Sequence, residues 1–311
     1  MVLLLTLICC LLWGSAFPAI KKGYELFGIA SSDSSSQILF AGLRFTLAGI
    51  LAALLGSAGA GRWLVPGKGS LPRIGVLAMF QTILQYTFFY LGLARTTGMK
   101  SSVINGSQAF ICILIAVYIF RQEKMTVRKL VGCLLGFAGV VVVNLGGSTE
   151  GGIHFSGEGL ILLSAVSYSF SVCFTKRFSK HDDPVMLSSY QFILGGIAMT
   201  AAGLAMGGKL GSTGAGGVVI LLYLAFVSAA AFSLWGLLLK YNPVSRISVF
   251  GFMTPVSGVV LSALFLSETQ SGDWLKMAVS LVLVALGIII VNTAKNKNNE
   301  KPLIWNSPYQ G

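Results

Sequence analysis

Charged residues are scarce in this sequence. They make up 10% of its 311 residues, whereas 55% of the residues are hydrophobic. A soluble domain carries about 25% charged residues, so this composition excludes an ordinary soluble protein. Apolar runs of about 18 residues or more recur along the chain, and each is long enough to cross a hydrocarbon core of about 30 Å. The sequence therefore predicts an all-α membrane protein with several transmembrane helices.

Acidic residues are missing from the middle of every apolar run. All ten carboxylates and both histidines fall in connecting segments or at the ends of the runs. Intramembrane carboxylates are the usual parts of proton relays and cation sites, so classical proton antiport lacks its expected component. Paired aspartates, a histidine-rich cluster and a serine–histidine pair at matching depth are also missing. We therefore expect no enzymatic activity, no metal and no cofactor.

Metal-ligand spacing is absent among the cysteines. All five fall in apolar runs, so free, buried and inert thiols are expected at Cys9, Cys10, Cys112, Cys133 and Cys173. The net charge of +12 comes mostly from short loops, which is typical of topology signals and does not favour a nucleic-acid partner. The apolar N-terminus has no basic region before it, so we interpret it as a transmembrane helix and not a signal peptide.

Ten apolar runs are interpreted as transmembrane helices, or spans. Short loops join them, so neighbouring helices should be antiparallel, and residues 295–311 form a polar cytoplasmic tail. The spans cover residues 2–20, 38–56, 74–93, 98–120, 127–145, 159–177, 185–206, 216–239, 245–266 and 274–293. With the N-terminus inside, fifteen lysines and arginines face the cytoplasm, six face outside and Arg44 lies within a span. This positive-inside bias predicts that both termini are cytoplasmic.

A pattern near the middle of the chain recurs near its end. Lys100–Glu123 and Ser245–Glu268 each have a polar lead-in, an apolar run and a terminal glutamate. Further on, residues 139–144 and 287–292 each read as a glycine, four β-branched residues and an asparagine. We expect Glu123 and Glu268 to anchor the following helix or to pair with nearby bases, such as Lys124 or Arg128; the alternative is a gating role.

Two further alignments support the repeat. Residues 13–22 align with 168–177, which pairs two basic dipeptides, and Leu47-Ala48-Gly49 aligns with Leu194-Gly195-Gly196. Each half, 1–146 and 155–294, holds five spans, an odd number, so the second half enters the membrane the opposite way up. Such inverted-topology repeats are typical of transporters with a substrate site near mid-membrane.

Several of these residues resemble a known family. The opening Trp13-Gly14-Ser15-Ala16-Phe17-Pro18, the Arg44-Phe45 pair, the two span-ending glutamates and the Thr254-Pro255 step resemble EamA-type members of the drug/metabolite transporter superfamily over residues 1–293. The resemblance implies a ten-helix carrier of two repeats in the inner or plasma membrane, which exports small metabolites, amino acids or drugs. It also implies a central cavity among spans one, three, four, six, eight and nine.

One departure from the family pattern concerns helix geometry. The first half has Phe110 where the second has Pro255, although family members often carry proline in both. We therefore expect a helix break in only one half. Pro18 and Pro255 are the candidate hinges, because proline frees a backbone carbonyl in a membrane helix. Gly132, Gly136 and Gly139 form a small-residue stripe that favours tight helix packing over dimerisation.

Polar and aromatic residues within the spans are the candidate substrate-binding residues. Arg44 either attracts an anionic substrate group, or bonds helix-end carbonyls or extends to the surface as a structural residue. The amides either line the cavity or join helices by hydrogen bonds. For Trp13, Tyr86 and Trp235, an interfacial belt competes with the cavity wall. The full set is Trp13, Arg44, Gln81, Gln85, Tyr86, Asn105, Gln108, Tyr168, Trp235 and Thr254.

Together these patterns favour a secondary transporter that works by alternating access as a monomer or homodimer. Its partners would be a small-molecule substrate and the lipid bilayer. The alternatives are an intramembrane enzyme, a scaffold and a channel. A scaffold gives no reason for buried amides in the central helices, and a channel is distinguished by its much higher flux.

Overall fold

Apolar helices make up nearly all of the described chain. The structure is a computed structural model, and it describes residues 2–30, 32–93, 95, 104–143, 155–211, 214–266 and 273–293, among which there is no strand. Six helices in these ranges are long and apolar enough to cross a membrane. They are α1 (Val2–Leu26), α2 (Ser34–Ala60), Leu71–Leu93, Phe155–Phe178, α9 (Pro184–Ala205) and α10 (Ala215–Tyr241).

Two of the six contain π-helical segments. Leu71–Leu93 consists of α3 (Leu71–Leu77), the π-helix η1 (Ala78–Leu84) and α4 (Gln85–Leu93). Phe155–Phe178 consists of the π-helix η3 (Phe155–Gly159) and α8 (Leu160–Phe178). Short π-helical segments within α-helices are frequent at functional sites.

The remaining helices are shorter. They are α6 (Gln108–Leu114) with the π-helix η2 (Ile115–Ile119), α7 (Val127–Val143), α11 (Val244–Ser248), the 3-10 helix η4 (Val249–Phe252), α12 (Met253–Leu266) and α13 (Asp273–Asn292). All of these elements lie within or beside the ranges predicted from the sequence. The predicted tail and Glu268 fall outside the described residues.

Helix α2 shows how local sequence sets an element's limits. The Asp33 carboxylate accepts a hydrogen bond from the Ser36 amide (3.1 Å), which caps the first turn. At the other end Gly61 adopts φ 62°, a left-handed conformation that glycine tolerates and that ends the helix. The helix is therefore longer at both ends than its predicted range, 38–56.

Helices α2 and α9 pack closely through small residues. A Cβ placed on Gly42 would lie 2.4 Å from the Thr200 amide nitrogen, and one on Gly196 would lie 2.5 Å from that of Thr46. The two threonines bond back to the glycine carbonyls one turn earlier in their own helices (2.9 and 2.8 Å). Only glycine permits this approach, because any Cβ would meet the backbone of the opposite helix.

Helices α7 and α13 pack in a similar way. A Cβ on Gly287 would lie 2.5 Å from the Gly132 carbonyl oxygen, and the Ser280 hydroxyl donates to the Gly139 carbonyl (2.7 Å). The glycine stripe of the fifth span therefore packs against a helix of the same chain. The prediction that it serves tight helix packing is confirmed.

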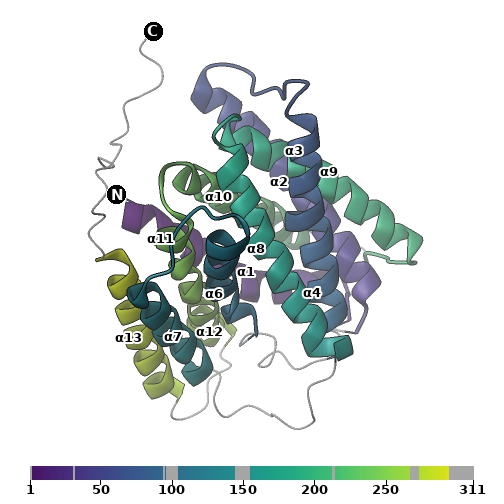
Figure 1. Cartoon of the computed structure of the whole chain (residues 1–311). Coiled ribbons are helices and arrows are strands. Elements are labelled where there is room, and N and C mark those ends of the chain that lie inside the picture. The colour runs from purple at the N-terminus through teal and green to yellow at the C-terminus, as the bar shows by residue number, and fades with distance from the viewer. Residues whose placement is uncertain are drawn as a thin grey trace.

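Three further helix contacts recur in pairs. Helix α1 packs against α10 and α12, while α8 packs against α4 and α6 (Figure 1). Helix α10 also packs against α2, and η1 against α9. Each of these contacts thus has a counterpart. In the counterpart, each helix is replaced by the helix that lies five spans earlier or later in the predicted order.

Both central helices of the predicted repeats are irregular. The 3-10 helix η4 ends at Phe252, one residue before α12 begins, and Pro255 in the first turn of α12 has no N–H to donate to the Gly251 carbonyl. In the other half the helix is interrupted at Ser107, whose hydroxyl donates to the Ile104 carbonyl (2.6 Å). The expectation of a break in only one half is therefore wrong. A serine hydroxyl that donates a hydrogen bond to a backbone carbonyl of its own helix can interrupt that helix without a proline.

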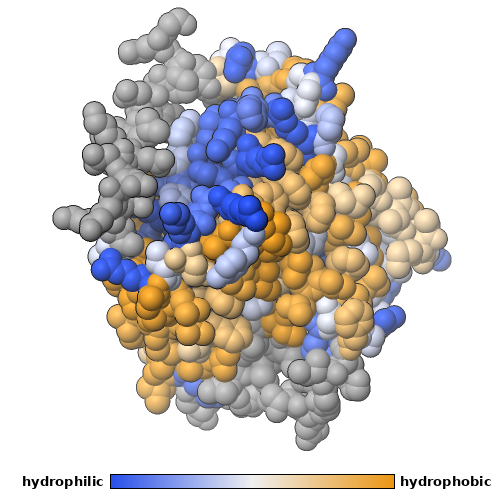
Figure 2. All heavy atoms as spheres, in the orientation of Figure 1, coloured by the Kyte–Doolittle hydropathy of each residue, from blue (hydrophilic) through white to orange (hydrophobic). Residues whose placement is uncertain are grey.

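The outer surface is strongly apolar. Figure 2 shows hydrophobic side chains over a broad band, with hydrophilic side chains gathered towards the upper end of the molecule. Large side chains such as Leu55, Val219 and Ile289 are 57–62% exposed. An apolar surface of this extent is suited to contact with lipid chains and not with water.

Candidate substrate site

Six aromatic rings make a connected row through the packed helices. Five helices carry them. Helix α10 carries Phe232 and Trp235, and α1, α2, α4 and α9 carry one ring each, which are Trp13, Phe45, Tyr86 and Phe192 in that order. Successive centroids lie 4.4 to 5.1 Å apart in the order Trp235, Trp13, Phe232, Phe192, Phe45 and Tyr86. We call this set the aromatic row. Rings at these spacings make favourable contacts and give one continuous apolar wall.

Arg44 lies at the Tyr86 end of the aromatic row. Its guanidinium carbon is 4.4 Å from the centroid of the Phe45 ring and 5.8 Å from that of Tyr86. The side chain is only 4% exposed. It lies ten residues into α2, about 15 Å along the helix at 1.5 Å per residue. The structural alternative in which Arg44 extends to the surface is therefore wrong.

Five of the ten predicted site residues carry a buried polar atom that makes no hydrogen bond within the described part of the chain. These atoms are Trp13 Nε1, Arg44 Nε, Gln85 Oε1, Trp235 Nε1 and Thr254 Oγ1. Most buried polar groups in proteins have a partner. Trp13 and Trp235 belong to the aromatic row and Arg44 lies against it, so three of these unpaired atoms are where a polar ligand could bind beside the rings.

The predicted aromatic residues lie in the interior. Trp235 is 2% exposed, so a place in a lipid-facing belt is wrong for this residue. Trp13 contacts both Phe232 and Trp235 at 4.9 Å. Trp13 and Tyr168 each pack against two hydrophobic clusters of the core, one around α6, α11 and α12 and the other around α2 and α9. These two residues therefore connect the row to the helices of the predicted central cavity.

The amides of the third span lie in and beside the π-helix. Gln81 is within η1 and Gln85 directly follows it, and they are 5% and 8% exposed. The neighbouring Thr82 hydroxyl donates to Gln191 Oε1 of α9 (2.7 Å). Thr82 and Gln191 thus join η1 to α9 by a hydrogen bond, while Gln85 Oε1 has no partner among the described residues.

The amides of the fourth span bond each other. Gln108 Nε2 donates to Asn105 Oδ1 (2.9 Å), as expected for residues three apart on one helix face. The Ser169 hydroxyl of α8 interacts weakly with the Gln108 carbonyl (3.3 Å). These contacts place the pair beside α8, and neither residue contacts a ring of the aromatic row through a described interaction.

The candidate hinge prolines lie on two helices that pack together. Pro18 is buried inside α1, and Pro255 is buried near the start of α12. A Cβ on Gly14 would lie 2.6 Å from Ser257 Cβ, and one on Gly258 would lie 2.7 Å from the Phe17 ring. The helices thus meet through glycines that lie within a turn of each proline.

Sequence reasoning missed four residues of this region. Phe192 and Phe232 complete the aromatic row with Phe45, which the sequence reasoning had named only as part of the family pattern. Tyr24 and Gln191 each contribute a buried polar atom that makes no hydrogen bond within the described residues. The two phenylalanines resemble ordinary core residues in the sequence. Gln191 was detectable, since it is an amide inside an apolar run, like the amides that were chosen.

Charged contacts join the two halves at one end of the helices. Glu123 accepts from the Ser245 amide (3.0 Å), from the Ser245 hydroxyl and from Lys129 Nζ (2.7 Å). Asp182 accepts from the Ser70 hydroxyl and from Arg73, each at 2.6 Å. Glu123 thus anchors the start of α11, and its basic partner is Lys129 and not the predicted Lys124 or Arg128.

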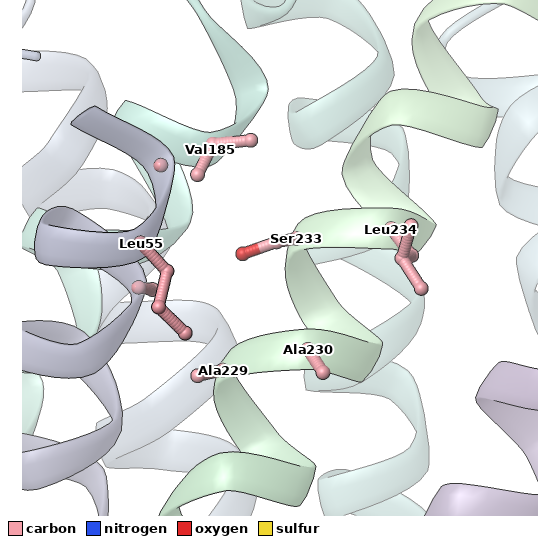
Figure 3. Close-up of a pocket in the computed structure, with 8 residues that line it drawn as sticks. Leu55, Val185, Ala229, Ala230, Ser233 and Leu234 are labelled. Atoms are coloured by element: carbon pink, nitrogen blue, oxygen red, sulfur yellow. The ribbon is translucent and has the colours of Figure 1, made fainter. Parts of the chain in front are cut away.

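A cavity of about 220 Å³ lies apart from the predicted site residues. Helices α2, α9 and α10 form it, and Ser233 points into the space between Leu55 and Val185 (Figure 3). Its lining is otherwise apolar, and consists of Ala52, Leu55, Gly56, Val185, Ala229, Ala230, Ser233 and Leu234.

Comparison with protein families identifies the family of this chain. The model of the EamA-like transporter family matches residues 1–145 and 155–293. The chain belongs to the EamA-like transporter family. The two matched segments together cover nearly the whole chain. With the apolar spans, this membership makes the chain a multi-pass membrane protein of a transporter family.

Several curated proteins are similar to this chain over most of its length. The chain is 29% identical over 288 residues to an uncharacterized transporter of Archaeoglobus fulgidus, with 90% and 94% of the two chains covered. It is 26% identical over 300 residues to a probable amino-acid metabolite efflux pump of Salmonella typhimurium, with 92% and 93% covered. A WAT1-related chloroplastic protein of Arabidopsis thaliana is 27% identical over 285 residues, which is 88% of this chain and 66% of that protein.

A crystal structure of a protein shares the fold. It superposes with a TM-score of 0.75 at 17% sequence identity, and the match covers 92% of this chain and 94% of the other. At this identity the likeness concerns the arrangement of the helices alone.

Proposed function

We propose that this EamA-family protein is a secondary transporter that exports small metabolites, amino acids or drugs by alternating access. The observation that carries the proposal is the aromatic row, which joins helices of both halves and lies beside buried polar atoms that make no hydrogen bond. Such a place is accessible to a ligand only if the helices around it move apart, as alternating access requires.

Inverted repeats of five helices each are part of this proposal. The glycine contacts support it, since Gly49 lies against Ile193 and Gly203 lies against Leu39, which is the same contact with the halves exchanged. Gly139 against Ser280 and Gly132 against Gly287 form a second exchanged pair. A two-fold axis in the membrane plane generates such reciprocal contacts, and two related conformations then open towards opposite sides.

The movement itself is assigned to the helices that carry prolines. The α2–α9 and α7–α13 pairs are closely packed through glycines, so they act as rigid supports. Helices α1 and α12 carry Pro18 and Pro255, and η4 interrupts α-helical hydrogen bonding before Pro255. In our proposal these two helices bend to expose the aromatic row.

The proposed orientation has both termini in the cytoplasm and the protein in the cell membrane. It follows from the distribution of basic residues. In this orientation the contacts of Glu123 with Ser245 and of Asp182 with Arg73 lie at the cytoplasmic end. They hold that end closed, so the described conformation is not open to the cytoplasm.

Flux into and out of reconstituted vesicles tests the proposal. One Salmonella relative is named as an amino-acid metabolite efflux pump, so the panel starts with amino acids and adds purines, sugars and cationic drugs. A carrier gives saturable flux that an unlabelled substrate on the opposite side accelerates. Flux far above carrier turnover supports a channel, and no flux with any member of the panel in well-folded protein contradicts transport of these classes.

A further inference from the structure

Arg44 is a buried cation without a counter-ion in the part of the chain that the structure describes. No carboxylate of the described residues lies within ion-pair distance of it, and its Nε makes no hydrogen bond. Arginine keeps its charge in proteins. A charge that is 4% exposed and has no partner of opposite sign among these residues is costly to bury.

The neighbouring rings offset only part of that cost. The guanidinium lies over Phe45 and near Tyr86. A cation–π contact that is shielded from water stabilises the charge by less than the cost of burying the ion. The arrangement therefore favours an added anion.

Other unpaired atoms near the aromatic row point in the same direction. Trp13 Nε1 and Trp235 Nε1, at the opposite end of the row from Arg44, are donors without acceptors among the described residues, and an indole nitrogen can only donate. The described acidic side chains are at helix ends or in connecting segments, as Glu123 and Asp182 are, so none is available to pair with an ammonium group. A site that offers donors and a cation selects a ligand that brings acceptors and negative charge.

We infer that the substrate is an organic monoanion with an aromatic or other apolar body, whose carboxylate binds Arg44 and whose body lies along the aromatic row. This inference rests on the proposed function and specifies its substrate class. The planar guanidinium matches a carboxylate with two parallel hydrogen bonds, and the rings of Phe45 and Tyr86 supply the adjoining apolar surface. A zwitterion with the same body binds less well, because its ammonium group finds no acid.

A series of probes with one phenyl body and different charge tests the inference. The series is 3-phenylpropanoate, phenylalanine, 3-phenylpropan-1-ol and 2-phenylethylamine, each titrated into purified protein and followed by calorimetry and thermal unfolding. A ligand that binds only the folded state raises the unfolding midpoint. We expect 3-phenylpropanoate to bind at least about tenfold more tightly than the alcohol, and the amine to bind most weakly.

Variants of Arg44 test whether this side chain causes the difference in binding between the probes. Arg44→Gln should weaken binding of 3-phenylpropanoate about tenfold or more and leave that of the alcohol within about twofold. Arg44→Lys, which keeps the charge without the planar fork, should lie between them. Arg62→Gln is the matched control, because Arg62 is exposed in a loop, and it should bind like the wild type. If Arg44→Gln does not fold, the wild-type probe series decides alone.

The outcomes separate this inference from the proposed function. Equal binding of the carboxylate and the alcohol, tightest binding of the amine, or no binding of the carboxylate overturns the inference. Saturable flux of other solutes with no effect of 3-phenylpropanoate leaves the transporter standing and removes the anion site. Charge-selective binding that depends on Arg44, without flux of any panel member, leaves the anion site standing and contradicts transport.

Discussion

At the scale of single residues, glycine positions control how near the helices approach. Gly42 and Gly59 lie on the same helix, α2, in opposite surroundings. A Cβ on Gly42 would lie 2.4 Å from the Thr200 nitrogen, whereas a Cβ on Gly59 meets nothing within 4 Å. The two positions therefore separate the effect of a close helix contact from the intrinsic effect of replacing glycine in a helix.

Gly42→Ala should destabilise the protein by about 1–3 kcal/mol, because the added methyl group forces two backbones apart. Gly59→Ala should be neutral or stabilise by about 0.4–1 kcal/mol, because alanine restricts the unfolded chain. Thermal unfolding of both variants in the same detergent measures the difference. Equal midpoints would contradict the close α2–α9 packing.

Asp33 gives a second prediction at this scale, concerning pH. Hydrogen bonds from Ser35 and Ser36 hold the pKa of the Asp33 carboxyl below its ordinary value. A lowered folded-state pKa means that the cap stabilises the protein above about pH 4, the unfolded value, and that this stability is lost as the pH falls through the folded-state pKa.

Asp33→Ala should therefore lower stability by about 1 kcal/mol at pH 7, and its deficit should shrink as the pH falls below about 4. Asp33→Ser retains a capping oxygen that does not titrate, so it should behave like the wild type at pH 7 and lack the acid-dependent loss. Unfolding midpoints measured from pH 7 downwards test both. A deficit of Asp33→Ala that stays constant with pH would show that the carboxylate's charge does not matter.

At the scale of elements, the positions of the helices could be predicted from the sequence but their irregularities could not. Each helix is an apolar run bounded by polar residues, and that pattern depends on local sequence alone. The interruption at Ser107 depends on the hydrogen bond from its hydroxyl to the Ile104 carbonyl. The sequence alone does not determine which acceptor this hydroxyl uses. Arg44 was identified as a candidate, but its aromatic surroundings come from α4 as well as from its own helix.

The alignment of the second spans was wrong for a physical reason. Gly49 was matched with Gly196, whereas the reciprocal contacts match Gly42 with Gly196 and Gly49 with Gly203. In each helix the two glycines lie about two turns apart on one face. A slip of two turns therefore still superposes a glycine on a glycine, and only contacts between the helices determine the register.

The proline-bearing element leads to a prediction about turnover. Pro255→Ala restores a donor to the Gly251 carbonyl, so η4 should convert to α-helix and α12 should bend less easily. We expect maximal flux to fall roughly fivefold or more while the substrate concentration at half-maximal flux changes less than about twofold. Pro72→Ala is the control, because Pro72 lies in the first turn of α3, where its missing N–H has no role. Unchanged maximal flux in Pro255→Ala would contradict the hinge.

At the scale of the whole molecule, the contacts of Glu123 are predicted to keep one end closed. Gln122 Nε2 donates to the carbonyl of Cys173 (3.1 Å), and Glu123 beside it binds Ser245 and Lys129. The Cys173 thiol is fully buried. We therefore expect an opening at this end to make this thiol more accessible.

Glu123→Gln removes the charge that holds Lys129 and weakens the bonds to Ser245, so Cys173 should react with a maleimide several-fold faster than in the wild type. Mass spectrometry locates the modified thiol among the five cysteines. Glu25→Gln is the control, because the Lys22–Glu25 pair is 48% and 67% exposed and contributes little. Equal labelling rates for Glu123→Gln and the wild type would show that these contacts do not control opening.

The pairing of α7 with α13 has a consequence for biosynthesis. The hydrogen bond from Ser280 to Gly139 joins residues 141 positions apart. At about 5–20 residues per second, a ribosome needs roughly 7–28 s to make that length of chain. During this interval the glycine face of α7 lies in the bilayer without the helix that covers it. The newborn chain therefore passes through a stage in which lipid, another nascent helix or an insertion factor must occupy the place of α13.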